Sequence, residues 1–343
     1  MVDRISTNES FMDYCIDKRL EGKSFLMDVD RLIDWKPIEK LLKKKYKKKQ
    51  SADGRPAYPA LPLFKMLLIQ RWYNLSDPGL EEAVRDRLSF LRFTGFSFES
   101  SIPDETTICR FRNELLKKGL YQKLLNRINQ QLEQKDILVK QGAIVDAALV
   151  TSARRPRKVV EVMTEDRKEE ESSPQSSGHE VRYSDDVEAA WVRKGNQPHY
   201  GYKVHMATDA TDGFILGGHV TPANRSDTVE LERVVDDLGL PEETVVLADK
   251  GYCSLSNREM LKARGFHDGI MERAARNRPL SEEARIRNRL ISRLRYAVEQ
   301  GFGTLKRRYR FDRARYVGRL KTEMEFYLTA MAFNIRKAVR MMA

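Results

Sequence analysis

Residues 143–150 are apolar at every position except Asp146. This segment follows Gly142 and is succeeded by a basic stretch that starts at Arg154. A short apolar run with such boundaries is typical of a strand that is buried in a sheet. Because an ionised side chain in the middle of a buried strand is costly, some partner must compensate the charge of Asp146.

The segments that follow predict the rest of this sheet. Residues 200–207 and 214–221 have strand patterns and are joined by turn-prone residues, which indicates an antiparallel hairpin. Two short apolar runs, at 245–248 and about 268–270, predict further strands. Helical patterns separate and follow these strands at about 228–238, 256–263 and 281–307. Three antiparallel strands followed by strands reached through helices form the ribonuclease-H-like topology. We therefore expect an α/β fold with a mixed five-stranded sheet and flanking helices.

The first part of the chain has a helical pattern, with apolar residues at helical intervals from Phe25 to about Lys140. The 343 residues also exceed what one hydrophobic core usually organises. We therefore expect an all-α N-terminal domain, 1–140, followed by the α/β domain, 141–343. The second domain should contain a flexible polar loop at about 154–188.

The charge of the chain indicates its partner. It has 62 Lys and Arg against 50 Asp and Glu, and the net charge of +12 attracts phosphate polyanions or anionic membranes. No apolar stretch approaches the roughly 18 residues of a spanning helix, and residues 1–10 lack the apolar core of a signal peptide. We expect a cytoplasmic, nucleoid-associated protein that binds nucleic acid and no membrane. The 3 Cys residues are far apart, so carboxylates must hold any metal.

Two further carboxylates lie where they could join Asp146. Asp249 follows the predicted strand at 245–248, and ligand sites gather at the carboxyl ends of such strands. The first and fourth strands are neighbours in the predicted topology, which brings Asp249 next to Asp146. Glu299 completes the cluster if its helix packs across the sheet.

Converging carboxylates repel one another unless cations neutralise them. Mg²⁺ prefers oxygen ligands and is usually held by one or two carboxylates together with substrate phosphates. Two such ions about 4 Å apart activate a nucleophile and stabilise the leaving oxygen in a displacement at phosphorus. The pattern therefore predicts a two-ion Mg²⁺ site that hydrolyses or transesterifies DNA, and Mn²⁺ is expected to substitute.

Arg295 and Lys306 lie one turn before and two turns after Glu299, so the three side chains share one helix face. Two interpretations of the cations stay open on spacing alone. They either grip the cleaved strand or form ion pairs within the helix on a solvated face.

Several motifs together resemble one family. Val145-Asp146-Ala147, Ala248-Asp249-Lys250-Gly251-Tyr252 and the helix pattern Arg295-x3-Glu299-x6-Lys306 are similar to motifs of bacterial insertion-sequence DDE transposases, insertion-sequence-five type. The resemblance covers nearly the whole chain and also includes Gly201-Tyr202-Lys203-Val204-His205, Thr221-Pro222-Ala223-Asn224-Arg225-Ser226-Asp227, and Pro103-Asp104-Glu105-Thr106-Thr107 followed by Phe111-Arg112. One departure is Ser292, which stands where relatives with the full helix pattern carry tyrosine.

This resemblance implies a DNA transposase that cleaves the ends of an insertion sequence and transfers strands into target DNA. It implies that Asp146, Asp249 and Glu299 are the catalytic, metal-binding triad, and that the N-terminal domain recognises terminal inverted repeats. Double-stranded DNA is the expected partner, at the repeats and at the target site. Pairing of two ends suggests a homodimer, including one assembled on DNA. The last helical segment, 322–342, could serve that dimer or cover the sheet.

Ten residues are candidates for DNA contacts: Arg295, Lys306, Lys250, Tyr252, Lys203, His205, Arg110, Arg112, Arg307 and Arg308. Lys203 and His205 share one face of a predicted strand. Arg110 and Arg112 lie on a helix that begins at the N-cap Asp104 and is either a recognition helix or an ordinary bundle helix. Similarly, the basic run at 43–49 is either a solvated helix end or an arm that contacts phosphate.

Two rival functions are consistent with the same residues. A nuclease of the same fold would cleave DNA without joining ends. A domesticated DNA-binding regulator would keep the helical domain while its catalytic centre decayed. The presence of all three carboxylates in their sequence contexts argues against the regulator.

Overall fold

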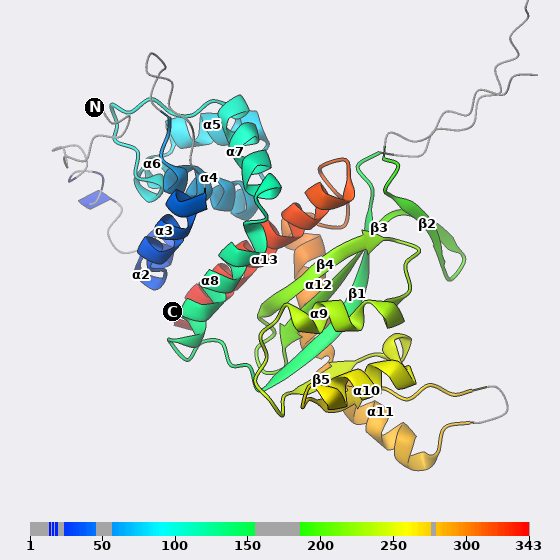
Figure 1. Cartoon of the computed structure of the whole chain (residues 1–343). Helices are drawn as coiled ribbons and strands as arrows, with labels where there is room; N and C mark the ends of the chain where they lie inside the picture. Colours follow the sequence, from blue (N-terminus) through cyan, green and yellow to red (C-terminus); the bar gives the residue numbers. More distant parts are fainter. Residues whose placement is uncertain are drawn as a thin grey trace, which may run out of the picture.

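The N-terminal part of the chain is helical, as the sequence predicts (Figure 1). The computed structural model describes residues 24–45, 57–154, 186–275 and 279–342, together with 14, 16, 18 and 19. The helices in this part are α2 (Phe25–Leu32), α3 (Trp35–Lys45), α4 (Ala60–Tyr73), α5 (Asp77–Asp86), α6 (Leu88–Thr94), α7 (Glu105–Lys117) and α8 (Tyr121–Glu133). The basic run at 43–49 lies outside the described residues from 46 onward, and so does most of the predicted loop at 154–188.

Local sequence explains where several of these helices begin and which helix is central. The side chain of Asp104 accepts a hydrogen bond from the N–H of Thr107, so the predicted N-cap of α7 is confirmed. Ser76 caps α5 in the same way through the N–H of Gly79. Helix α4 has no amphipathic stripe, because residues 62–72 are buried on every side of the helix. This helix is therefore the centre of the N-terminal bundle.

The second part contains one mixed sheet with the ribonuclease-H-like topology. Its strands are β1 (Gly142–Thr151), β2 (Ala190–Lys194), β3 (Gln197–Asp209), β4 (Ile215–Pro222), β5 (Val245–Ala248) and β6 (His267–Ile270). The order β4-β3-β1-β5-β6 is antiparallel among β1, β3 and β4 and parallel among β1, β5 and β6. The predicted neighbours, first and fourth in the expected sheet, are confirmed as β1 and β5.

The prediction of five strands was wrong, because the described part of the sheet has six. The extra strand is β2, which pairs with an extension of β3 through a tight turn at Gly195, where φ is 60°. Its residues are mostly exposed, so the sequence carries no apolar alternation that would reveal it. The hairpin projects from the sheet in Figure 1.

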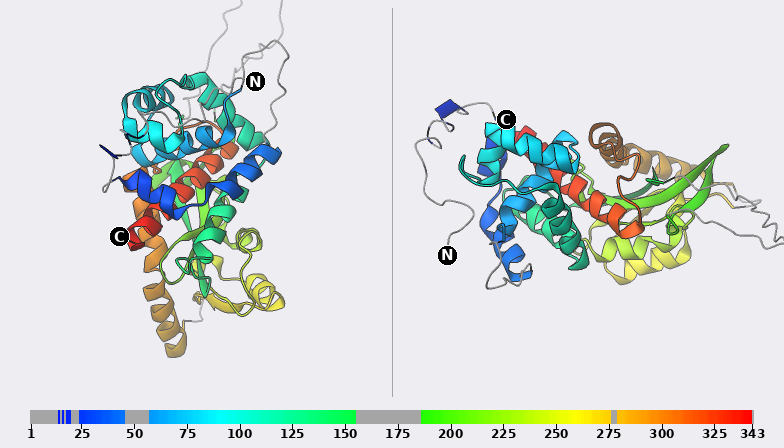
Figure 2. Two further views of the ribbon diagram at one scale, coloured as in Figure 1. Left: turned by 90° about the vertical axis from the view of Figure 1, so that its left-hand side faces the viewer. Right: turned by 90° about the horizontal axis from the view of Figure 1, so that it is seen from above.

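Helices cover both faces of the sheet, as Figure 2 shows (right). On one face lie η1 (Asp227–Val229), α9 (Leu231–Asp236) and α10 (Leu255–Ala263), and on the other lies α12 (Tyr296–Tyr309), which packs on β1 and β3. The single helices predicted at 228–238 and 281–307 are each divided. The first becomes η1 and α9, and the second becomes α11 (Glu282–Leu294) and α12, with Arg295 between them at a ψ of −9°.

The last helix, α13 (Arg319–Met342), joins the two parts of the molecule. It packs against α2, α4 and α8 on one side and against β4 on the other. The guanidinium of Arg71 in α4 lies 2.9 Å from the carboxylate of Glu325 in α13, and both side chains are buried. One continuous hydrophobic core therefore runs through the helices and the sheet. None of the described helices combines the length and apolar character needed to cross a bilayer.

Candidate active site

Two parallel strands place Asp146 and Asp249 side by side. β1 and β5 pair in parallel, with Val145 opposite Ala248, so the next residue of each strand is one of the two aspartates. Asp249 leaves β5 and begins the short turn η2 (Lys250–Tyr252). Its carboxylate accepts a hydrogen bond of 2.6 Å from the N–H of Gly251, which fixes the side chain against its own turn.

A single arginine partly neutralises this pair of carboxylates. The Nη2 atom of Arg295 lies 2.8 Å from Oδ2 of Asp146, and Oδ1 accepts the N–H of Ala147 at 2.8 Å. Burial raises the pKa of Asp146, the ion pair with Arg295 opposes this, and the charge of Asp249 raises the pKa further. The two adjacent carboxylates carry more negative charge than the guanidinium of Arg295 neutralises, so this site keeps excess negative charge.

Glu299 lies on the helix that covers this site but points to solvent. Gly301, on the same helix, packs toward the side chain of Met206, which is paired with Asp146 across the sheet. Thus α12 covers the face of the sheet that carries Asp146. Glu299 itself is exposed, and no three acidic, His or Cys side chains of the described residues are close enough to hold one metal ion. The structure therefore brings Asp146 and Asp249 together, while Glu299 is apart from them.

A third aspartate, Asp227, stands close to Asp249 and was not among the predicted catalytic residues. A Cβ atom at Gly251 would lie 2.8 Å from Oδ1 of Asp249 and 3.4 Å from Oδ2 of Asp227. Lys203 forms an ion pair of 2.8 Å with Asp227. Asp227 follows a strand and precedes a helix, so from sequence alone it has the pattern of a capping residue. Only the contact between η1 and η2 reveals its position.

Three of the side chains predicted to contact DNA are buried in this structure. Arg112 forms two hydrogen bonds of 2.7 Å with Asp77 inside the helical bundle. His205 and Tyr252 are fully buried beneath the aspartates, with 3.4 Å between Nδ1 and the tyrosine oxygen. The residue pattern of a strand does not tell which face of the sheet a helix covers. Here α9 packs on β3 and β4 and covers the face that carries His205. Lys203 is largely enclosed by its ion pair with Asp227.

The remaining predicted cations lie nearer the surface. Lys250, Arg110, Arg307 and Arg308 are exposed, and Lys306 is half-buried. A hollow of about 280 Å³ runs along β1 from Ala147, the residue after Asp146, to Thr151. It is also lined by Lys306, Lys194, His199 and Asp312. Lys194 and His199 come from the unpredicted hairpin, so sequence analysis could not associate them with this site. Burial lowers the pKa of Lys306, and the neighbouring Lys194 lowers it further.

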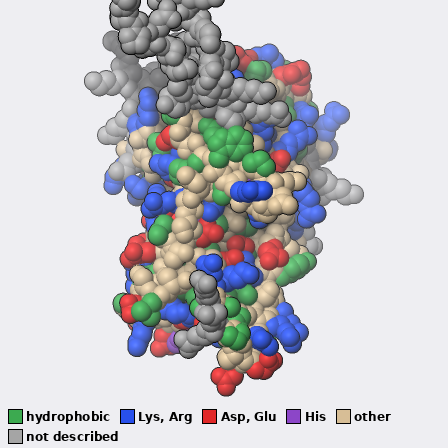
Figure 3. All heavy atoms as spheres, turned by 90° about the vertical axis from the view of Figure 1, so that its right-hand side faces the viewer, with side chains coloured by type: hydrophobic (Ala, Val, Ile, Leu, Met, Phe, Trp, Pro, Cys, Tyr) green, Lys and Arg blue, Asp and Glu red, His purple; other side chains and the backbone are tan. Residues whose placement is uncertain are grey.

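Figure 3 shows one face of the molecule, on which acidic side chains and Lys and Arg side chains lie interspersed. The Lys and Arg side chains on such a surface attract a polyanion.

Comparison with known proteins decides the family. The family described as "Transposase DDE domain" matches residues 137–335, and "Transposase domain (DUF772)" matches residues 14–114. The chain is also 40% identical over 232 residues to the transposase for insertion sequence element IS1106 of Neisseria meningitidis serogroup B, covering 67% of this chain and 76% of that protein. The chain belongs to the DDE transposases of bacterial insertion sequences. The narrower insertion-sequence-five type stays a prediction for this transposase.

Solved structures of other transposases are more remote. The piggyBac transposase synaptic complex with hairpin DNA has 11% identity and a TM-score of 0.39, covering 93% of this chain and 79% of that chain. The Mos1 mariner paired end complex with Mn has 12% identity and a TM-score of 0.22, covering 97% and 96%. These TM-scores are too low to transfer any residue's role to this transposase.

Proposed function

We propose that this transposase cuts DNA at the ends of its insertion sequence and joins them to target DNA, using divalent ions held by Asp146, Asp249 and Glu299. The observation that carries the proposal is the register of β1 and β5, which sets two aspartates side by side. A dedicated N-terminal domain at 1–140 would recognise the terminal inverted repeats. The chain's excess of basic residues supports DNA as the partner.

The chemistry of the donor set fits a divalent ion. Carboxylate oxygens are the ligands that Mg²⁺ and Mn²⁺ prefer. The partly buried Asp146 adjoins a second carboxylate, and within the described residues Arg295 is the one cation in ion-pair contact with it. Metal ions bound there, two of them in our proposal, would supply charge stabilisation and a nucleophile for displacement at phosphorus. Glu299 would be the third ligand, since it lies on the helix that covers Asp146.

The protein's own residues then have separate tasks. The hydrogen bond from the N–H of Gly251 orients Asp249. Arg295 orients Asp146 and limits the repulsion between the two carboxylates. Lys306 and Lys194, across the hollow that begins at Ala147, would bind phosphates of the strand being cut. Exposed Lys250 would contact the same strand next to Asp249.

The first test is cleavage and strand transfer with Mg²⁺ on a labelled duplex that carries the DNA ends flanking this gene. Wild type should yield cut and joined products. Asp249→Asn should lose at least about 100-fold in rate, because metal-held charge stabilisation is worth several kcal/mol. The variant should still bind the ends in EDTA with the same dependence on salt, since binding depends on phosphate contacts elsewhere.

Four outcomes contradict parts of the proposal. Equal cleavage by Asp249→Asn would remove this carboxylate from the site. Cleavage without joined products would favour a nuclease, and binding without cleavage under Mg²⁺ or Mn²⁺ would favour a regulator. A parallel Glu299→Gln variant tests the exposed carboxylate separately, because full activity of that variant would exclude it from the metal site.

We also propose a homodimer assembled on DNA, because joining requires two ends. Sedimentation of the protein alone and with the end duplex should show one chain without DNA and two chains with paired ends. A single chain on DNA under conditions that give joined products would contradict the dimer.

A further inference from the structure

A second basic hollow lies on the side of α12 that faces away from the proposed catalytic stripe. Arg295, Glu299 and Lys306 follow one line along the helical segment. At 3.6 residues per turn, Gln300, Thr304 and Arg308 lie roughly half a turn away from that line. These residues line a hollow of about 170 Å³ between α12 and α13. The hollow is therefore separate from the one that begins at Ala147.

Four cationic side chains surround this hollow: Arg308 from α12 and Arg336, Lys337 and Arg340 from α13. Within the described residues, none of the four has an acidic side chain at ion-pair distance. Lys337 donates to the carbonyl of Asp212, and the carboxylates of Asp209 and Asp212 act on its charge without forming an ion pair with it. Such a concentration of like charge is unfavourable unless an anion joins it.

Arg336 shows that the hollow is built rather than merely exposed. Its guanidinium lies 4.1 Å from the ring centroid of Phe25, which holds the side chain between α13 and α2. Its Nε atom is buried and has no hydrogen-bond partner among the described residues. Burial lowers the pKa of Arg336, and Arg308 and Arg340 lower it further. A guanidinium held in place among repelling cations favours an anionic oxygen in the hollow that it lines.

We propose that this hollow binds a backbone phosphate of DNA, in a segment other than the strand at Asp146 and Asp249. Phosphate is the fitting group, since arginine forks match its oxygens and the volume admits a group of that size. Exposed Arg308 and Arg340 extend the charge beyond the hollow, as a continuous polyanion requires. The inference rests on the proposed function only in taking DNA as the polyanion.

The test is the salt dependence of DNA binding in EDTA, where no cleavage occurs. Arg308→Gln with Arg340→Gln changes two exposed side chains, so the fold should be retained. The matched control, Lys262→Gln with Arg289→Gln, removes two exposed cations from α10 and α11. If the hollow holds DNA, the slope of log K against log salt should fall by about 2 for the first variant, roughly 0.9 for each lost contact. The control slope should stay unchanged.

A second arm distinguishes DNA from a free anion. Inorganic phosphate is added to wild type and to the Arg308/Arg340 variant, and the Tm of each is measured. A smaller slope for this variant, with no phosphate-dependent difference in Tm, supports the DNA site. An unchanged slope overturns it, and a phosphate-dependent rise in the Tm of wild type alone then assigns the hollow to a free anion. Equal slope changes in both variants also overturn it, since the loss would then be nonspecific.

Measuring cleavage at the DNA ends alongside the salt slope distinguishes failure of the proposed function from failure of this DNA site. If wild type never cuts DNA in Mg²⁺ but the slope falls as expected, the proposed function fails while the DNA site stands. If wild type cuts and joins ends but the slope is unchanged, the site fails while the proposed function stands.

Discussion

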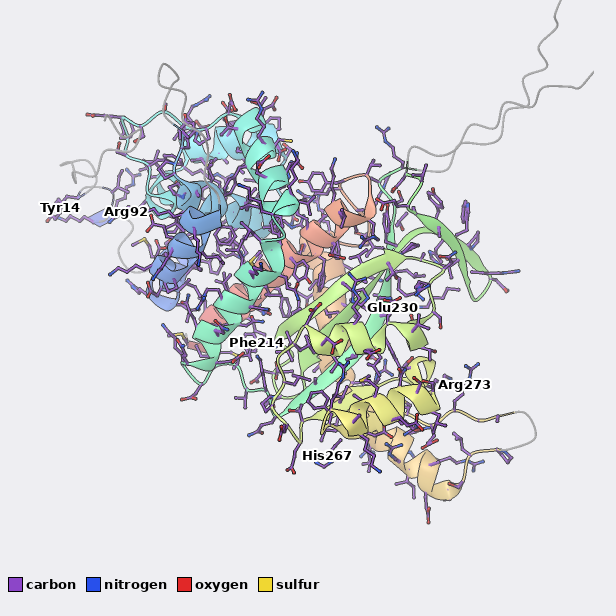
Figure 4. The ribbon with its side chains drawn as sticks, in the orientation of Figure 1. Tyr14, Arg92, Phe214, Glu230, His267 and Arg273 are labelled. Atoms are coloured by element: carbon purple, nitrogen blue, oxygen red, sulfur yellow. The ribbon has the colours of Figure 1, made fainter. Side chains whose placement is uncertain are left out.

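His205 is a buried histidine directly beneath the proposed catalytic turn. Its ring nitrogens lie 3.1 Å from Oγ1 of Thr221 and 3.4 Å from the oxygen of Tyr252. Its ring stacks on His219, with 5.1 Å between centroids, and His219 contacts Glu230, which is labelled at the start of α9 in Figure 4. Burial and then the charge of His219 lower the pKa of His205 to about 3, while Glu230 opposes the shift.

This environment predicts a loss of stability in acid. The ordinary pKa is 6.5, so between that value and about 3 the unfolded chain binds a proton that the folded chain excludes. The contribution of neutral His205 to the free energy of unfolding is therefore complete above the unfolded pKa of 6.5, and it is lost progressively as pH falls from 6.5 toward about 3. Between about pH 7.5 and about pH 5.5, His205→Gln should lose about 1 kcal/mol less than wild type in urea unfolding. Exposed His267→Gln should behave as wild type, and an identical acid loss in His205→Gln would contradict the prediction.

Gly251 is the residue whose substitution should separate activity from stability. An added Cβ would meet the carboxylate of Asp249 at 2.8 Å. Because the obstacle is the end of a side chain, the fold can adapt while Asp249 moves. We expect Gly251→Ala to reduce the cleavage rate by about tenfold or more with a change in stability under about 1 kcal/mol. Rates and Tm measured on one preparation check this, and full activity would show that the position of Asp249 is not critical.

At the scale of elements, the sequence predicts those parts whose signals are local. The apolar run around Asp146 predicts β1, and the run before Asp249 predicts β5; their adjacency follows from the topology and is confirmed. The cap at Asp104 is likewise a local signal. The positions of these elements therefore needed no knowledge of tertiary contacts.

The missed features depend on contacts between distant segments. The polar edge strand β2 is defined by its pairing with β3 and has no apolar pattern of its own. The break between α11 and α12 occurs at Arg295, whose ion pair reaches back to Asp146 in β1. Asp227 joins the site only because η1 and η2 are in contact. Spacing along one helix or one strand carries no information on such pairings.

Asn257 in α10 links the two short turns at the site, and its loss should affect Asp249 specifically. Its side-chain amide donates to the carbonyl of Thr228 at 2.9 Å and to that of Tyr252 at 2.8 Å. Asn257→Ala leaves both carbonyls without this donor, which should cost about 1–3 kcal/mol and loosen the turn that carries Asp249. We expect a lower Tm together with a cleavage rate about tenfold lower at a temperature where the variant is folded.

Asn288→Ala is the matched control for this variant. Asn288 also makes two hydrogen bonds with backbone groups, both on Glu272 in the segment before α11. It should lower stability by a similar amount without affecting Asp249. Equal losses of activity in the two variants would mean that general destabilisation, and not the link between the turns, explains the effect.

At the scale of the whole molecule, α13 makes the two predicted domains depend on each other. By sequence order it belongs to 141–343, yet Trp72 of α4 donates a hydrogen bond of 2.8 Å to the carbonyl of Ala332 in α13. Arg71 of α4 contacts Glu325 and Thr329 of the same helix. The helical bundle therefore uses α13 as one of its walls.

The buried pair of Arg71 and Glu325 gives a test of this dependence. Glu325→Gln leaves the guanidinium of Arg71 buried without a charged partner at a junction of both parts, which should cost about 3–5 kcal/mol. Glu39→Gln, which loses an ion pair with the exposed Lys43, should cost less than about 1 kcal/mol. Calorimetry should show one transition in wild type and in both variants, shifted strongly only for Glu325→Gln. Two transitions, with only one shifted, would mean that the helical bundle and the sheet unfold separately and that α13 does not couple them.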